Sequence, residues 1–408
     1  MSHTFDLIDN PWIGCISPNG AGVELGLRAV FERAHQLRGV QGDTPLESGA
    51  IYRLLLAILH RVFGPKSRKE WLHLKQVGRF EMQALNAYLE RWRHRFDLFD
   101  EKRPFYQAAD KRASPKSVIS LMPEMASGNN AAWFDHHTEA EGAEIGAGKA
   151  ARALLAAQAF GLAGLSGMEQ KFTDAPCTRG VLFLVEGDSL FETLLLNLLI
   201  YTEEQPLPGS AEDRPCWEME DPFQPARTIP RGYLDYLTWQ NRRVLLLPNQ
   251  DDEGKTVVRE ITVAPALRLD SSVLDPMKHY RKDEQRGALP LRFNEERALW
   301  RDSRALLQLH MPDRYRPPLS LRWVDELVDA GYLDPSRRYR LMALGMANNQ
   351  AKVEFFREEH LPLPLKFLED EVLVEQLGIA LEWAEATSRS LRQGAERLAL
   401  LLISPKSD

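Results

Sequence analysis

Cysteine is scarce in this sequence, and the few cysteines are not spaced as ligands. Cys15, Cys177 and Cys216 are the only three in 408 residues, and no two of them form a CxxC pair. The sequence therefore indicates neither a secreted disulfide framework nor a cysteine-rich zinc site. The N-terminus also lacks the basic and apolar regions of a signal peptide, so we expect a protein of the reducing cytoplasm.

Long hydrophobic runs are missing as well. The longest apolar stretch, Ile51 to Phe63, is interrupted by Arg53, His60 and Arg61. It is shorter than the roughly 20 apolar residues that a membrane span needs. This stretch predicts a buried helix, and we expect no membrane partner.

The chain lacks an excess of positive charge and several familiar catalytic motifs. It has 51 lysines and arginines against 58 acidic residues, a net charge of −7, which argues against a protein that coats nucleic acid over its whole surface. This net charge does not exclude a local basic groove. The sequence shows no HExxH, no GxSxG after a predicted strand and no GxxxxGK[ST] loop.

What is present is the composition of a globular protein. With 44% hydrophobic residues and 408 positions, the chain has material for two or three structural units. The Leu361-Pro-Leu-Pro364 stretch indicates a boundary between an N-terminal α+β domain with small irregular sheets, residues 1–362, and the start of a helical bundle, residues 363–408. Apolar residues recur every three or four positions from Leu373 to Leu402, which predicts one amphipathic helix about 45 Å long.

Local patterns predict several further elements. The capping box Thr44-Pro-Leu-Glu47 begins a helix that Gly64-Pro65 ends. An opening strand at Phe5–Ile8 leads into a hairpin whose second strand is Gly22–Leu25. The remaining predicted segments are helices at Glu81–Arg95, Lys149–Phe160 and Ser189–Tyr201, a helix end at Leu234–Gln240, and strands at Val181–Val185 and Arg243–Leu247.

The clearest hairpin pairs Arg338–Leu344 with Lys352–Arg357 across a loop from Gly345 to Ala351. The tip, Asn348-Asn-Gln-Ala351, carries amides that can read base edges or be pushed between base pairs. Asparagine is also common in turns for conformational reasons alone, so both interpretations stay open.

Two loops are further candidates. Gly161, Gly164 and Gly167 form a flexible segment near Lys171 and Arg179, where the backbone could approach phosphate closely, although a plain surface loop fits equally. Residues 114–146 form a long connection of the kind that is usually functional or disordered. Its Trp133-Phe134 pair could stack on bases or act as a hydrophobic plug.

The same connection holds Asp135-His136-His137, a tripeptide of metal-dependent phosphoesterases. That chemistry requires additional carboxylate ligands at strand ends, and the sequence offers no DxD pattern upstream. A metal-dependent phosphoesterase is therefore retained only as an alternative function. A second alternative is that the protein is a purely architectural subunit.

Taken together, the sequence resembles CasA, the large subunit of the type I-E CRISPR surveillance complex Cascade. The resemblance covers nearly the whole chain, and the family's motifs occur in the family's order. They are Phe5-Asp-Leu-Ile-Asp-Asn-Pro-Trp-Ile13, Tyr52-Arg-Leu-Leu-Leu-Ala-Ile-Leu-His60, Arg103-Pro-Phe-Tyr-Gln107, Gly128-Asn-Asn-Ala-Ala-Trp-Phe-Asp-His136, Leu234-Asp-Tyr-Leu-Thr-Trp-Gln-Asn-Arg-Arg243, Leu274-Asp-Pro-Met277 and Asn348-Asn-Gln-Ala351.

The resemblance implies a subunit without catalytic activity or cofactor. In the family it inspects the protospacer-adjacent motif of double-stranded target DNA from the minor groove, starts duplex opening, and later docks a helicase-nuclease. Its partners are the crRNA and the backbone, small and handle-binding subunits. The residues that carry over are Asn349 and Ala351 as motif contacts, Gln350 as the wedge, Gly164, Ser166 and Gly167 as the glycine loop, Arg268 in place of a minor-groove lysine, and Asn130, Trp133, Phe134 and Asp135 in the loop that reaches the crRNA handle and the motif.

The sequence departs from the family pattern in two places. Some members hold zinc with two cysteine pairs, whereas the matching stretch here, Glu144–Gly148, contains no cysteine, so we expect no metal. The family ends in a four-helix bundle, and residues 363–408 match only its first helix. The resemblance therefore transfers the docking role of that bundle less firmly than the DNA-reading role.

Overall fold

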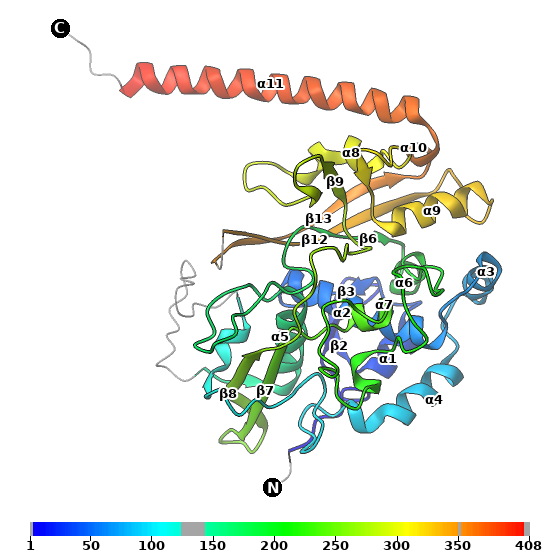
Figure 1. Cartoon of the computed structure of the whole chain (residues 1–408). Helices are drawn as coiled ribbons and strands as arrows, with labels where there is room; N and C mark the ends of the chain where they lie inside the picture. The colour runs from blue at the N-terminus through cyan, green and yellow to red at the C-terminus, as the bar shows by residue number, and fades with distance from the viewer. Residues whose placement is uncertain (1–2, 124–142, 350–351, 404–408) are drawn as a thin grey trace.

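The computed structural model describes residues 3–123, 143–349 and 352–403. Figure 1 shows a large body at the N-terminal end, a smaller layer of strands and short helices above it, and one long helix that crosses the top. This arrangement confirms the α+β class with small sheets. The helices are α1 (Leu27–Arg33), α2 (Pro45–Val62), α3 (Arg68–Val77), α4 (Met82–Trp92), α5 (Ala147–Phe160), α6 (Leu190–Leu196), α7 (Tyr233–Leu237), α8 (Ser303–Leu307), α9 (Leu319–Asp329), α10 (Lys366–Glu369) and α11 (Glu371–Ile403).

The strands of the described residues form four small sheets. These strands are β1 (Ile13–Ile16), β2 (Gly22–Leu25), β3 (Gly39–Val40), β4 (Lys116–Ser117), β5 (Ile145–Gly146), β6 (Leu182–Glu186), β7 (Arg242–Gln250), β8 (Thr256–Pro265), β9 (Tyr280–Asp283), β10 (Gly287–Pro290), β11 (Tyr315–Arg316), β12 (Arg338–Asn349) and β13 (Lys352–Pro364). The orders of the strands in the four sheets are β2-β1-β3, β10-β9-β11, β13-β12-β6 and β4-β8-β5, with β7 also paired to β8.

Helix α2 forms the centre of the main core, as its apolar sequence predicts. The Thr44 hydroxyl accepts a hydrogen bond from the Glu47 amide, and every residue from Leu46 to His60 is buried. Its buried charged residues, Glu47 and Arg53, are paired inside the core. Arg53 contacts Asp275 at 3.4 Å, and Glu47 accepts a 3.1 Å hydrogen bond from Arg152 of α5. Burial of these charges is tolerated because each one has a partner.

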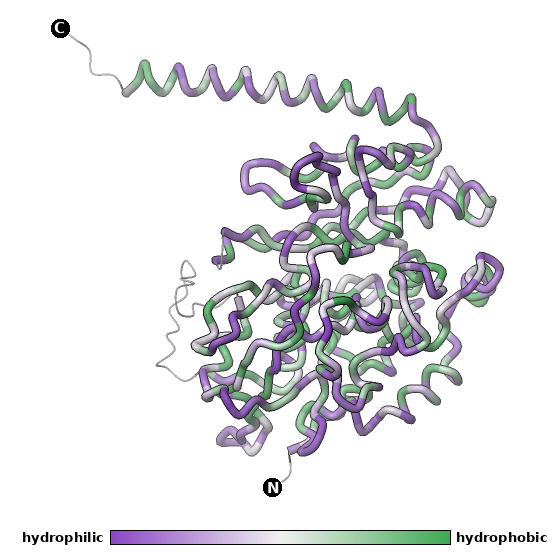
Figure 2. Tube along the Cα trace, viewed as in Figure 1, coloured by the Kyte–Doolittle hydropathy of each residue, from purple (hydrophilic) through white to green (hydrophobic). Residues whose placement is uncertain are grey.

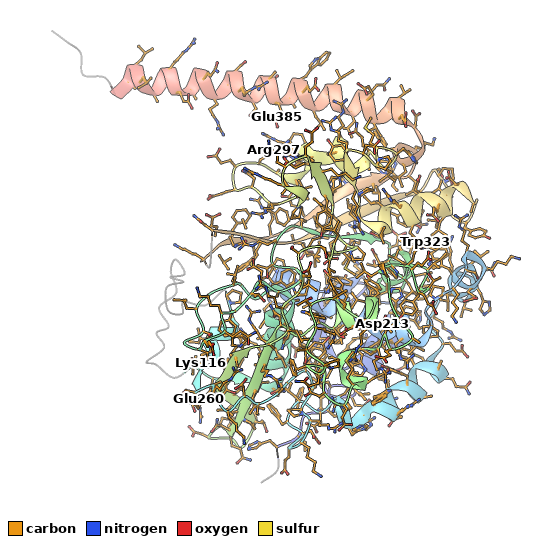
Figure 3. All side chains as sticks on the ribbon, in the orientation of Figure 1. Lys116, Asp213, Glu260, Arg297, Trp323 and Glu385 are labelled. Carbon is orange, nitrogen blue, oxygen red and sulfur yellow. The ribbon has the colours of Figure 1, made fainter. Side chains whose placement is uncertain are left out.

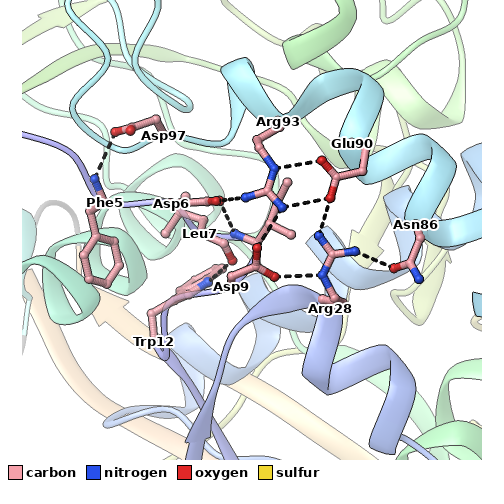
Figure 4. Close-up of polar contacts among 11 residues, drawn as sticks. Phe5, Asp6, Leu7, Asp9, Trp12, Arg28, Asn86, Glu90, Arg93 and Asp97 are labelled. Carbon is pink, nitrogen blue, oxygen red and sulfur yellow. Dashed lines mark hydrogen bonds and ion pairs between the residues drawn. The ribbon is translucent and has the colours of Figure 1, made fainter.

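The segment before β1 is not the strand that its sequence predicts. Asp6 forms only an isolated bridge with Asp97, and single backbone hydrogen bonds to neighbouring segments also hold the chain here. Asp6 and Asp9 both bind the Arg93 guanidinium, and Asp9 also accepts a 2.7 Å hydrogen bond from Arg28 (Figure 4). Isolated backbone bonds and an ion-pair network therefore hold this segment where a strand ladder was expected.

Helix α11 confirms the predicted long amphipathic helix. Figure 2 shows apolar and polar residues alternating along its whole length. Arg304 contacts Glu375 and Glu382, and Arg297 contacts Glu385 at 3.5 Å, so its first half is tied to the layer below (Figure 3). Exposed apolar side chains along it are Val372, Ile379, Trp383, Leu391, Leu398, Leu400, Leu401 and Leu402.

Several predicted boundaries are corrected by the structure. The loop expected from Gly345 to Ala351 is mostly strand, because β12 continues to Asn349. The helix expected at Ser189–Tyr201 ends at Leu196, and α3 was not predicted. Strand β13 runs to Pro364, two residues past the predicted domain boundary, which itself remains a prediction.

Candidate nucleic-acid interface

The β12–β13 hairpin is the longest pair of strands in the described chain, and its far end projects beyond the main body (Figure 1). Its register runs from Arg338 opposite Pro364 to Asn349 opposite Lys352, with an irregularity after Ala347. Asn349 and Lys352 are both exposed. The hairpin thus presents an amide and a cation at its end, while Gln350 and Ala351 lie outside the described residues.

The base of the hairpin is fixed inside the protein. Strand β12 lies between β13 and β6, and Leu341, Ala343, Leu344 and Met346 are buried. A main-chain ladder on both sides of β12 prevents this base from shifting without breaking several hydrogen bonds.

A charged cluster spans the three strands of this sheet. His360 on β13 contacts Glu186 of β6 at 2.7 Å and Glu358 at 2.9 Å, and Arg340 of β12 contacts the other oxygen of Glu186 at 2.9 Å. Hydrogen bonds to Glu186 and Glu358 raise the pKa of His360 to about 9. The imidazole is therefore protonated at neutral pH and joins β13 to β6 by charge across β12, the strand that pairs with both.

The second candidate element is the glycine loop, which we define as residues 161–173 between α5 and the chain leading to β6. Gly164 and Phe172 exchange two backbone hydrogen bonds of 3.3 and 3.0 Å, which draws the loop into a narrow turn. The Ser166 hydroxyl donates to the Gln170 carbonyl at 2.6 Å and accepts from the Met168 amide. Gly167 has φ of +73°, so a side chain there would strain the backbone.

The loop is open at Gly164. A Cβ atom built on Gly164 would have no heavy atom within 4 Å, as is also the case at Gly167. The neighbouring Leu165 is 84% exposed. A bare backbone next to an exposed apolar side chain is suited to close approach by a flat surface such as a base-pair edge.

Beneath the loop lies Arg242, which had no predicted role and falls just before the predicted strand Arg243–Leu247. Its guanidinium donates to the Leu162 carbonyl at 2.6 Å and to Asn241 at 2.7 Å, and it lies 5.3 Å from the centre of the Phe172 ring. Burial lowers the pKa of Arg242 to about 10, so it remains charged at neutral pH. The loop backbone therefore has a buried positive charge on its inner side.

One cavity joins the two elements. It has a volume of about 270 Å³ and is lined by Met346 and Val353 of the hairpin and by Gly164 and Leu165 of the glycine loop. Lys116 of β4, labelled in Figure 3, also lines it. The structure therefore brings together two candidate elements that are almost 200 residues apart in sequence.

The other predicted site residues either do not line this cavity or lie outside the described residues. Arg268 is exposed in the chain after β8, and it is not among the residues that line this cavity. Gln170 of the glycine loop donates to the Ala266 carbonyl at 3.1 Å, which ties the loop to the segment that carries Arg268. Further candidates lie outside the described residues: Asn130, Trp133, Phe134, Asp135, His136 and His137.

Metal and thiol chemistry find no support in what is described. Within residues 3–123, 143–349 and 352–403, no three His, Cys, Asp or Glu side chains are grouped as ligands. All three cysteines are buried and unpaired, and burial raises the pKa of Cys177 to about 11. These thiols are therefore protonated at neutral pH and are poor ligands or nucleophiles.

In the described part of the chain, no helix has the length and hydropathy to cross a bilayer.

Comparison with known proteins gives a consistent result. The family model described as CRISPR-associated protein Cse1 matches residues 6–400. A protein from Thermus thermophilus named CRISPR-associated protein CasA/Cse1 is 37% identical over 98% of this chain and 79% of its own length. The crystal structure of Cse1 from Acidimicrobium ferrooxidans superposes with a TM-score of 0.82 at 27% identity, covering 96% of this chain and 77% of that one. A chain from a structure titled CRISPR RNA-guided surveillance complex superposes at 0.79 with 28% identity, covering 99% and 85%.

Proposed function

Because the chain belongs to the CRISPR-associated Cse1 family, the large subunit of the type I-E Cascade complex, we propose that it inspects the protospacer-adjacent motif of double-stranded DNA and begins strand separation. The inspection takes place from the minor groove, where base edges distinguish A·T from G·C pairs but little else. We therefore expect several motif sequences to be accepted.

The observation that carries this proposal is the cavity shared by the hairpin and the glycine loop. Two elements suited to contacting DNA would have little joint effect if they faced different directions. Here Met346 of the buried base of the hairpin and Val353, closer to its tip, line the same cavity as Gly164 and Leu165. A duplex that lies along this face can therefore meet both elements at once.

Each element has a separate role in the proposal. Asn349 and Ala351 contact base edges, and Gln350 is pushed between the first base pairs as a wedge. Gly164, Ser166 and Gly167 bring backbone close to the duplex, and the exposed Arg268 neutralises phosphate. The wedge has a limited task, because opening a DNA step costs about 1–2 kcal/mol and pairing with the guide returns a similar amount.

The partners follow from the same proposal. We infer that the chain works within an assembly of backbone, small and handle-binding subunits around crRNA, and that it helps to recruit a helicase-nuclease. Asn130, Trp133, Phe134 and Asp135 would contact the crRNA handle. A net charge of −7 is compatible with this role if the partner subunits supply most of the basic groove. The chain itself would carry out no catalysis and require no cofactor.

The test uses the assembled, guide-loaded complex and two duplexes that differ only in the flanking motif. We expect the wild-type complex to discriminate between them, and the Asn349→Ala/Gln350→Ala variant to assemble normally but lose discrimination or strand opening. A matched control is Gln285→Ala, which removes an exposed amide at the β9–β10 turn. If the double variant and the control behave alike, motif recognition lies elsewhere and the subunit is architectural.

A further inference from the structure

The β12–β13 hairpin loses the support of its third strand well before its tip. The ladder between β12 and β6 ends at Leu344. The next pair of the hairpin, Gly345 and Arg357, therefore begins a two-stranded ribbon that continues to Asn349 and Lys352. A two-stranded ribbon has little stability of its own in water, so its direction depends on what holds it at this junction.

At this junction Arg357 binds a segment from outside the sheet. Its guanidinium donates to the Asn294 carbonyl at 3.0 Å and to the Glu295 carbonyl at 3.4 Å. Both carbonyls belong to residues 293–299, which lead from β10 into the short helix η5 (Leu299–Asp302) and which we call the brace segment. Within the described chain β13 has no ladder partner except β12, so this side chain supplies a support that the backbone does not.

Two further contacts hold the same junction. Glu359 accepts a 2.9 Å hydrogen bond from the Leu299 amide and contacts Arg357 at 3.4 Å. The centre of the buried Phe293 ring lies 5.7 Å from the Arg357 guanidinium carbon, within the range of a cation–π contact. A Cβ atom on Gly345 would be 3.5 Å from this ring, so Phe293 lies against the residue that pairs with Arg357. The brace segment therefore reaches both strands of the hairpin.

The brace segment is itself anchored. The Asn294 carbonyl also accepts a 3.4 Å hydrogen bond from the Arg297 amide, which closes a turn. The Arg297 guanidinium, labelled in Figure 3, contacts Asp302 at 2.7 Å. Just before the segment, the Leu291 carbonyl accepts a 2.9 Å hydrogen bond from the Val181 amide. The segment can therefore support the hairpin rather than follow its movements.

An irregularity lies between this junction and the tip. The register slips by one residue after the Ala347–Phe355 pair, which leaves Glu354 as an extra residue on β13. Such bulges bend and twist a strand and are common next to functional sites. At about 3.4 Å per residue, β13 spans about 17 Å from Arg357 to Lys352, so a tilt of about 10° at Arg357 would move the tip by about 3 Å.

We propose that Arg357 is a positioning residue for the hairpin tip: by joining β13 to the brace segment, it fixes the direction of the tip and thereby the rate at which the first target base pairs open. The inference rests on the proposed function, in which Gln350 at this tip is the wedge. In enzymes, a misplacement of about 1 Å can cost about a hundredfold in rate. A tilt of the hairpin would therefore disable the wedge without removing it.

The experiment uses the assembled, guide-loaded complex and follows the opening of the first target base pairs by the fluorescence of 2-aminopurine placed there. We expect Arg357→Met to slow the opening of a fully paired duplex at least about tenfold. A duplex whose non-target strand is mismatched at these positions needs no wedge, so its binding should change less than about twofold. The matched control is Arg338→Met, which removes an exposed arginine at the base of the same hairpin and should change neither result.

Three readouts separate positioning from other roles of an arginine. If Arg357 bound a DNA phosphate, Arg357→Met would reduce the salt slope of duplex binding by about one unit, whereas positioning leaves this slope unchanged. Because Gln350→Ala removes the wedge, Arg357→Met should slow opening no further when it is added to that variant. Phe293→Leu keeps Arg357 but removes the ring beside it, and it should slow opening severalfold.

The inference is overturned if Arg357→Met opens the paired duplex as fast as wild-type protein, if it impairs the paired and the mismatched duplex equally, or if its effect adds fully to that of Gln350→Ala. If Gln350→Ala alone leaves opening unchanged, the proposed wedge fails and this inference fails with it. If Gln350→Ala slows opening and Arg357→Met does not, only the inference fails. Should Arg357→Met not assemble, Phe293→Leu decides in the same assays.

Discussion

The glycine loop and the β12–β13 hairpin line the same cavity, but they are held by different kinds of interaction. The hairpin is fixed by the main-chain ladder between its own strands, by a second ladder from β12 to β6, and by a buried apolar base. The glycine loop has a single pair of strand-like hydrogen bonds and depends on side chains from elsewhere, above all Arg242. A strand ladder is built from backbone atoms and therefore tolerates many different side chains. The conformation of a loop held by one buried guanidinium depends instead on the few atoms that bind it. The two elements should therefore fail in different ways when they are mutated.

The largest effect should come from truncation at the base of the hairpin. Met346 is 4% exposed on β12, so Met346→Ala removes buried apolar contacts beside the cavity and should lower the free energy of unfolding by about 3 kcal/mol. Chemical denaturation of the free protein measures this loss. Lys352→Ala, an exposed change nearer the tip, should alter stability by less than about 0.5 kcal/mol. Equal losses from both variants would show that the base does not anchor the hairpin.

A somewhat smaller loss is expected from overpacking the glycine loop. A Cβ atom at Gly161 would lie 2.3 Å from the Arg242 Cζ atom and 2.6 Å from the Ala157 carbonyl oxygen. Since Arg242 is buried and the carbonyl belongs to α5, neither can move freely, and Gly161→Ala should destabilise the protein by about 2 kcal/mol. Hydrogen exchange should place the loss at residues 161–173 rather than in the hairpin. Unchanged exchange in this loop would contradict the role given to Arg242.

A third prediction uses pH to test the charged link at the edge of the hairpin. The pKa of His360 is raised to about 9 in the folded protein by Glu186 and Glu358, against an ordinary value of about 6.5. A raised pKa means that the stabilisation is complete below pH 6.5 and is lost as the pH rises from 6.5 to 9. The imidazole is more than a third exposed, so solvent screening limits the effect to about 1 kcal/mol.

The measurement is the difference in unfolding free energy between wild-type protein and His360→Gln across that range. This difference should shrink as the pH rises. A difference that is flat from pH 6 to pH 9.5 would show that β13 and β6 are held together only through their separate ladders with β12.

The same contrast explains what could be predicted from sequence. The hairpin is encoded locally, in alternating residues and an amide-rich turn, so its existence and its tip were recognised from residues 338–357. Its length was underestimated because Gly345, Met346 and Ala347 are weak strand formers, and they become strand only by pairing with β13. The long amphipathic helix and the buried helix α2 were likewise readable from periodicity.

The glycine loop was recognised from the sequence, but its geometry was not, because that geometry depends on partners far away in the chain. Arg242 is about 80 residues from the carbonyl that it binds, and no local pattern marks that contact. The same limit applies to Phe5–Ile8, where isolated backbone hydrogen bonds and ion pairs with Arg93 replace the expected strand ladder.

The smallest effect on stability should accompany a clear effect on function. Gly164→Ala adds a methyl group where no heavy atom lies within 4 Å, so the free energy of unfolding should change by less than about 0.5 kcal/mol. In the assembled complex the same methyl group would stand between the loop backbone and the duplex, and we expect motif-containing DNA to bind severalfold more weakly. Gly161→Ala provides the opposite case, because its clash lies on the inner side of the loop. If Gly164→Ala binds DNA as wild-type protein does, the open face of the loop is not where the duplex lies, and the hairpin must act without it.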